Sequence, residues 1–114
     1  MIESIATAEH YKWGADCDGW HLLKSDQLSV IQEMMPPGTD AALHYHSKSQ
    51  QVFYILEGTA TFKLQNEIYT MVKGESIAVT AGAVHQILNN SDSLLSFLVI
   101  SAPKAHGDRV NIEV

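Results

Sequence analysis

Hydrophobic and polar residues alternate over short runs along this chain, and residues that favour turns bound each run. Eight runs rich in β-branched and aromatic residues fit this description: Trp20–Leu23, Leu28–Met35, Gln51–Leu56, Thr59–Leu64, Ile68–Val72, Ser76–Val79, Val84–Leu88 and Leu94–Ile100. Many short strands with closely spaced turns predict an all-β sandwich or barrel. A weak helical period occurs only at Ser4–Lys12. No linker interrupts the pattern, so residues 1–114 are predicted to form a single domain.

The composition is that of a soluble globular protein with one hydrophobic core. Of the 114 residues, 46% are hydrophobic and 18% are charged. The net charge is −6, and the seven Lys and Arg residues are scattered along the chain. Without a basic stripe that could neutralise phosphates, no nucleic-acid partner is expected. The acidic balance instead favours solubility.

Three features of the sequence bear on the cellular compartment. Cys17 is the only cysteine, which excludes an internal disulfide, fits a reducing compartment and predicts a small core residue. The N-terminus carries Glu3 and Glu9 and no basic start before an apolar run, so no signal peptide is expected. The longest apolar stretch, Leu94–Ile100, is too short to span a membrane. We therefore expect a cytoplasmic protein without a membrane partner.

A first group of polar residues lies within a frame of glycines. Gly38 is followed after five residues by His44, then His46, Gln51 after four more residues, and Gly58 after six. If His44 and His46 lie in an extended strand, their side chains share one face, about 7 Å apart along the backbone. Two imidazoles placed in this way can converge on one metal ion. Glycines suit the tight turns of such a frame because they tolerate positive φ.

A second framed group follows fifteen residues later. Gly74, Thr80, Gly82, His85 and Asn89 occur at fixed spacing, with His85 at the start of a predicted strand. His85 can reach the ion that His44 and His46 would bind only if the sheet curls into a barrel. Inward-facing residues of several strands then share a common axis.

These two groups resemble the motifs of the cupin superfamily. The first motif, residues 38–58, has Gln51 where the family has a glutamate, and the second, residues 74–89, has Thr80 where the family has a proline. The short spacer resembles that of small, single-domain microbial cupins. The resemblance implies a double-stranded β-helix, or jelly-roll barrel. It also implies one divalent transition metal ion (Mn, Fe, Ni, Cu or Zn) bound by His44, His46, His85 and Gln51.

Gln51 changes the chemistry of the predicted site. Its amide oxygen can coordinate a metal but is neutral and a weaker donor than a carboxylate, and it cannot act as a general base. Alternatively, Gln51 hydrogen-bonds a metal-bound water or a ligand histidine. Gln50 competes with it at the shorter family spacing, although the six residues before Gly58 favour Gln51. For Asn89, a hydrogen bond to a metal ligand or a structural hydrogen bond is expected rather than coordination.

Two functions are compatible with such a site. The first is a metal-dependent enzyme, an oxygenase, isomerase or lyase, acting on a small organic molecule. The second is a non-catalytic module that binds a small molecule or a metal ion, because cupins host many functions. In either case a homodimer is expected. The segment Trp13–His21 is predicted as a lid, a dimer contact or simple packing, and His10, His21 and His106 as solvated or singly hydrogen-bonded histidines.

Overall fold

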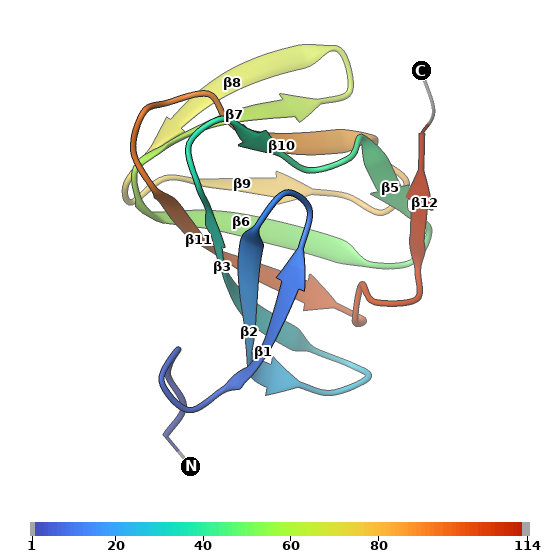
Figure 1. Cartoon of the computed structure of the whole chain (residues 1–114). Helices are drawn as coiled ribbons and strands as arrows, with labels where there is room; N and C mark the ends of the chain where they lie inside the picture. The colour runs from blue at the N-terminus through green and yellow to red at the C-terminus, as the bar shows by residue number, and fades with distance from the viewer. Residues whose placement is uncertain (1, 113–114) are drawn as a thin grey trace.

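The computed structural model describes residues 2–112, which form twelve β-strands and no helix (Figure 1). The strands are β1 Glu9–Trp13, β2 Cys17–Lys24, β3 Ser29–Met35, β4 Thr39–Asp40, β5 His44–His46, β6 Gln50–Glu57, β7 Thr59–Leu64, β8 Glu67–Val72, β9 Ser76–Val79, β10 His85–Asn89, β11 Leu95–Ala102 and β12 Arg109–Asn111. No helix of these residues is long and apolar enough to cross a membrane.

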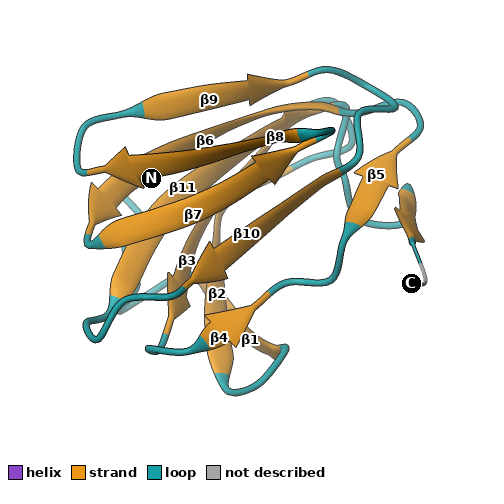
Figure 2. Ribbon diagram, turned by 90° about the horizontal axis from the view of Figure 1, so that it is seen from above, coloured by secondary structure: helices purple, strands orange, loops and turns teal. Residues whose placement is uncertain are grey.

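The strands form two sheets that face each other. The first sheet has the order β1-β2-β3-β11-β6-β9, and the second has the order β12-β5-β10-β7-β8, with β4 paired to β10. All pairings are antiparallel. Seen from above, β5 and β12 lie side by side at one end of the barrel (Figure 2). Strands that are distant in sequence therefore point their inward side chains at one interior, which confirms the predicted double-stranded β-helix.

Each of the eight predicted runs overlaps one strand, whereas four further strands lie outside these runs. Those four are β1, β4, β5 and β12, of which β5 was considered only as an extended pair of histidines. The weak helical period at Ser4–Lys12 was misleading. Residues 5–7 form a turn, and Glu9–Trp13 pair with β2 in a hairpin. Tertiary pairing overrides a weak local propensity here.

The hydrophobic core lies between the two sheets. Its fully buried side chains include Met35, Ile55, Phe62, Leu95 and Phe97, which come from both sheets. Cys17 is also buried in this cluster, as predicted for a small core residue. Because side chains alternate along β6, Phe53 and Ile55 point inward while Tyr54 is exposed. Phe53 also lines a pocket together with His44 and His85, so the core borders this pocket directly.

Gly58 shows why the frame glycines are needed. Its φ is +86°, and a Cβ at this position would lie 2.5 Å from the backbone oxygen of Leu94. A side chain here would both strain the backbone and collide with an immobile neighbour. Gly38, Gly74 and Gly82, the other glycines of the two frames, also have positive φ.

Candidate metal centre

Three buried histidines converge at one end of the barrel. His44 and His46 come from β5 and His85 from β10, and His44 and His85 lie directly opposite each other in the sheet. One ligand atom from each residue lies within 4.8 Å of the other two. The centroids of the His44 and His85 rings are 4.3 Å apart. Three imidazoles at this separation can bind one metal ion.

Backbone carbonyls determine which ring nitrogens remain available. The Nδ1 atoms of His44 and His85 lie 2.7 Å and 2.9 Å from the carbonyl oxygens of Ala42 and Ala83. A carbonyl only accepts hydrogen bonds, so each Nδ1 carries the proton and each Nε2 keeps its lone pair. His85 Nε2 and His46 Nδ1 are buried without a hydrogen-bond partner. Unpartnered buried nitrogens at a histidine cluster fit a metal ion as the missing partner.

Burial also keeps the three imidazoles neutral. Desolvation lowers the pKa of His44 to about 3 and is also the main cause of the lowered pKa values of His46 and His85. Hydrogen bonds to backbone carbonyls oppose the shift at His44 and His85 but do not reverse it. Neutral imidazole is the form that binds metals.

Two loop contacts position His46 relative to the other ligands. The Gly82 N–H donates a hydrogen bond of 2.7 Å to the His46 carbonyl, which ties the turn before β10 to the end of β5. The Asp108 carboxylate accepts backbone hydrogen bonds from residues 47, 48 and 49, the turn that follows His46. These hydrogen bonds hold the pKa of Asp108 below its usual value, and the bond from the Lys48 N–H has the largest effect. The loops that carry the ligands are thus held by hydrogen bonds to their backbone, from another loop and from the Asp108 carboxylate.

Gln51 lies beside the histidines, on β6. It is buried, and its Nε2 donates a hydrogen bond of 3.0 Å to Ser101 Oγ on the neighbouring strand β11. Its Oε1 is buried and has no partner. Gln50 is exposed, so Gln51 is the residue that faces the pocket. An oriented amide oxygen without a partner fits either open role, ligand or acceptor from a metal-bound water.

Asn89, the last residue of the second frame, has a structural role, as expected. It is fully buried, and its Nδ2 donates to the carbonyls of Met35 and Ser93. Its Oδ1 accepts hydrogen bonds from the backbone and side chain of Ser91. Asn89 therefore anchors the turn before β11.

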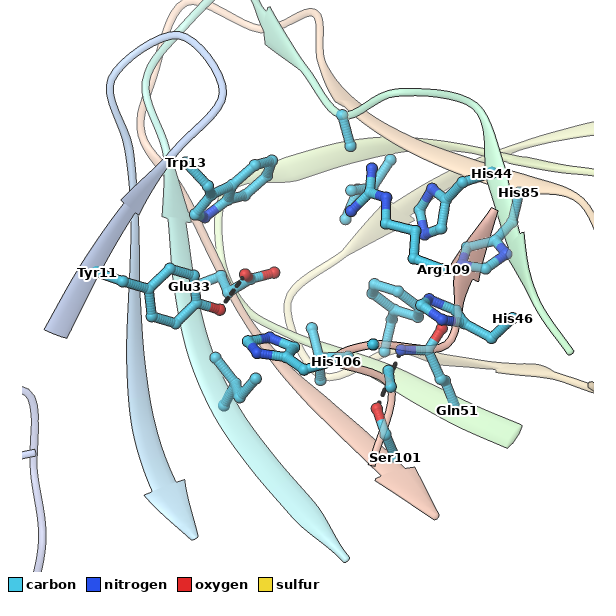
Figure 3. A pocket seen from close by; sticks show the side chains of 17 residues that line it. Tyr11, Trp13, Glu33, His44, His46, Gln51, His85, Ser101, His106 and Arg109 are labelled. Carbon is cyan, nitrogen blue, oxygen red and sulfur yellow. Dashed lines mark hydrogen bonds between the residues drawn. The ribbon is translucent and has the colours of Figure 1, made fainter. Parts of the chain in front are cut away.

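The histidines form one wall of a pocket of about 410 Å³. Tyr11 and Glu33 lie on the wall across from them, where the Tyr11 hydroxyl donates a hydrogen bond of 2.8 Å to Glu33 Oε2 (Figure 3). Arg109 projects into the space between the walls. It lies opposite His46 in the β5–β12 ladder, so both side chains face the same side. This volume suits a small molecule.

Sequence reasoning missed several residues of this pocket. Glu33, Tyr11, Arg109 and Ser101 carry no motif, although alternation along Leu28–Met35 places Ile31, Glu33 and Met35 on one face. Trp13 and His106 also line the pocket; His106 had been expected as an ordinary solvated or singly hydrogen-bonded histidine. His10 lies outside the pocket and contacts Asp18.

Residues 31–101 match the Cupin domain family. An uncharacterised protein of Methanocaldococcus jannaschii is 31% identical over 94 residues, which are 82% of this chain and 75% of that protein. An oxalate-binding protein of Thermotoga maritima is 29% identical over 85 residues, 70% of either chain. The crystal structure of a predicted oxalate decarboxylase from Thermotoga maritima has a TM-score of 0.84 at 20% identity, covering 91% of this chain and 100% of the other. The chain therefore belongs to the cupin family.

Proposed function

We propose that this protein is a metal-dependent enzyme, a lyase or isomerase, that acts on a small organic acid. The observation that carries the proposal is the convergence of His44, His46 and His85 on the wall of a pocket that also contains Arg109. With these histidines, and with the Gln51 amide oxygen as a fourth donor, a divalent ion would act as a Lewis acid toward a bound carboxylate.

Charge in the pocket favours an anionic ligand. Three neutral imidazoles and an amide leave the two positive charges of the ion uncompensated, and Arg109 adds a third. Glu33 is the only carboxylate among the described residues that line the pocket. A ligand carboxylate between the metal position and Arg109 would compensate positive charge at both, because guanidinium binds carboxylates well. The protein as a whole is acidic, so this local positive charge is not a general property of its surface.

A second candidate function is binding without turnover. The name of the oxalate-binding relative, which is 29% identical, favours it. In this case the same residues would hold a small dicarboxylate, and the ligand would be released unchanged.

Calorimetry with matched ligands tests the proposal. Metal-loaded protein is expected to bind oxalate and to bind oxamide, its neutral diamide, at least tenfold more weakly. Arg109→Gln should weaken oxalate binding by about tenfold or more, whereas Lys73→Gln, an equal charge change at an exposed lysine, should not. Equal affinity for oxalate and oxamide, or oxalate binding that survives removal of the metal, would contradict the proposal.

The two functions differ in the fate of the ligand. A panel of small acids, including 2-oxo and 2-hydroxy acids, incubated in large excess with metal-loaded protein and analysed by NMR would reveal any conversion. Product formed in several turnovers per chain supports the enzyme. A ligand that binds tightly and is recovered unchanged supports the binding module.

A further inference from the structure

The pocket contains a carboxyl group that the histidine motifs do not include. Glu33 lies on β3, where its side chain points inward between those of Ile31 and Met35. Its direct neighbours in the sheet are Gly19 on β2 and Phe97 on β11, neither of which is charged. In Figure 3 the carboxylate faces the space that separates it from the histidines. A carboxyl at this position borders any molecule bound at the metal centre.

Glu33 is the last residue of a row that crosses three strands, with Tyr11 on β1 and Gly19 on β2. Tyr11 pairs with Gly19, and Gly19 pairs with Glu33. The tyrosine ring covers Gly19, because a Cβ on Gly19 would lie 2.3 Å from Tyr11 Cζ. The missing side chain lets the ring cross β2, so that the hydroxyl reaches Glu33 Oε2. This row gives the carboxyl a fixed orientation on a rigid sheet.

The surroundings of Glu33 allow it both to hold and to release a proton near neutral pH. Burial raises its pKa to about 7, although the Tyr11 hydrogen bond and the Arg109 charge oppose this shift. Burial together with the Glu33 charge raises the pKa of Tyr11, so the hydroxyl remains a donor. Titratable groups near Glu33 include Tyr11 from β1, Cys17 from β2 and Arg109 from β12. His106 lines the same pocket, with its ring against that of Tyr11. Tyr11 and Arg109 can both stabilise the ionised carboxylate.

We infer that Glu33 is the acid–base group of this pocket and exchanges a proton with the small acid bound between the histidines and Arg109. In the forward direction the O–H bond of Glu33 breaks and its proton bonds to an oxygen or carbon of the ligand, whose electron pair forms the new bond. The remaining carboxylate accepts the Tyr11 hydrogen bond, and the reverse transfer restores the acid. No oxidant or reductant is needed. This inference rests on the proposed function for its ligand, and it supplies the proton acceptor that the Gln51 amide cannot be.

A direct titration tests the group without any ligand. In metal-loaded protein labelled with ¹³C at glutamate carboxyls, the signal that is absent from Glu33→Gln is expected to titrate near pH 7. Tyr11→Phe removes a donor to the ionised form, so the same signal should titrate at higher pH. Gly19→Ala displaces the ring and should shift it in the same direction. A Glu33 signal that titrates near the ordinary glutamate value of about 4.3 would overturn the inference.

Proton linkage then tests the exchange with a bound acid. Oxalate is titrated into metal-loaded protein at pH 7 in buffers that differ in ionisation enthalpy, which reports the protons taken up on binding. A second negative charge near Glu33 favours its protonated form, so wild type should take up about half a proton. Glu33→Gln should abolish this uptake with unchanged metal content, and Glu67→Gln, at an exposed glutamate, should retain it.

The outcomes separate the two proposals. If wild type and Glu33→Gln take up the same number of protons when oxalate binds, the role of Glu33 is overturned and the proposed function remains intact. If wild type binds no small acid, the proposed function fails, and the carboxyl titration alone then decides whether Glu33 is the proton-exchanging group.

Discussion

The two walls of the pocket are held by different kinds of contact. On the histidine wall (His44, His46 and His85), two rings are each oriented by the carbonyl two residues earlier, Ala42 for His44 and Ala83 for His85. On the acid wall (Tyr11, Gly19 and Glu33), the carboxyl is oriented by a hydroxyl 22 residues away in sequence. The first arrangement depends on local loop geometry, and the second depends on the register of three strands. A slip of β1 or β2 would therefore separate Tyr11 from Glu33, whereas the ring orientations of His44 and His85 do not depend on those two strands.

Burial acts on both walls but with opposite consequences for proton binding. It lowers the pKa of the histidines and raises that of Glu33, so each wall is pushed toward its uncharged form. One wall thereby keeps lone pairs for a metal ion, and the other keeps a proton. The walls can consequently be tested separately.

The largest effect is expected from removing a histidine. His44→Ala and His85→Ala should each weaken binding of a divalent ion by about a hundredfold or more, because each removes one of three converging ligands. Metal content per chain after gel filtration, measured by mass spectrometry, checks this.

His10→Ala is the matched control, since His10 lies on β1 outside the pocket and contacts Asp18. Circular dichroism should show the β-sheet signal in all three variants. Wild-type metal content in both His44→Ala and His85→Ala would mean that the histidine wall is not a metal site.

The next effect is on stability and concerns the acid wall. Because the pKa of Glu33 is raised to about 7 in the folded protein, its contribution to stability is present below about pH 4.5 and is lost as pH rises to about 7. The histidines have lowered pKa values, so their contribution has the opposite sign and is lost as pH falls below about 6.5.

Glu33→Gln should isolate the first contribution in metal-free protein. From pH 4.5 to 7 the variant should gain stability relative to wild type, by on the order of 2 kcal/mol in the free energy of unfolding. Urea unfolding at several pH values, with Glu67→Gln as the exposed control, measures this difference. A difference that is constant with pH would show that burial does not perturb Glu33.

The histidine wall and the acid wall also differ in how far they could be predicted from the sequence. The spacing of the histidines and their glycines was visible in the sequence, but the meeting of His85 with His44 depends on the pairing of β10 with β5 and was predicted only through the resemblance to cupins. Glu33 lies in a strand that was predicted, but its meeting with Tyr11 depends on pairing between distant segments. Tyr11 belongs to a stretch with a weak helical period, whose strand conformation arises from pairing with β2. The spacing to Gly58 already favoured Gln51 over Gln50, and the structure agrees, since Gln51 is buried and Gln50 is exposed.

A smaller effect on metal affinity is expected from a change at Gln51, which lies beside the histidines. Gln51→Glu replaces the neutral Oε1, which is buried without a partner, by an anionic oxygen of nearly the same shape. If Oε1 binds the metal, affinity should rise by about tenfold, or about 1.4 kcal/mol. A smaller increase would indicate a hydrogen bond to a metal-bound water. Competition with a metal-sensitive chelator measures it, and unchanged or weaker binding would mean that residue 51 does not face the ion.

The smallest effect is expected from Ser101, which lines the pocket and orients Gln51 through a hydrogen bond. Ser101→Ala removes the oxygen that accepts from Gln51 Nε2, so the amide loses the contact that directs Oε1 toward the histidines. Metal affinity should fall by about threefold to tenfold, at or below the lower end of what such supporting hydrogen bonds contribute, because Gln51 itself is a neutral donor. Ser96→Ala is the matched control, since Ser96 is also buried on β11 but does not line the pocket. Equal affinity in the two serine variants would show that Gln51 needs no support from β11.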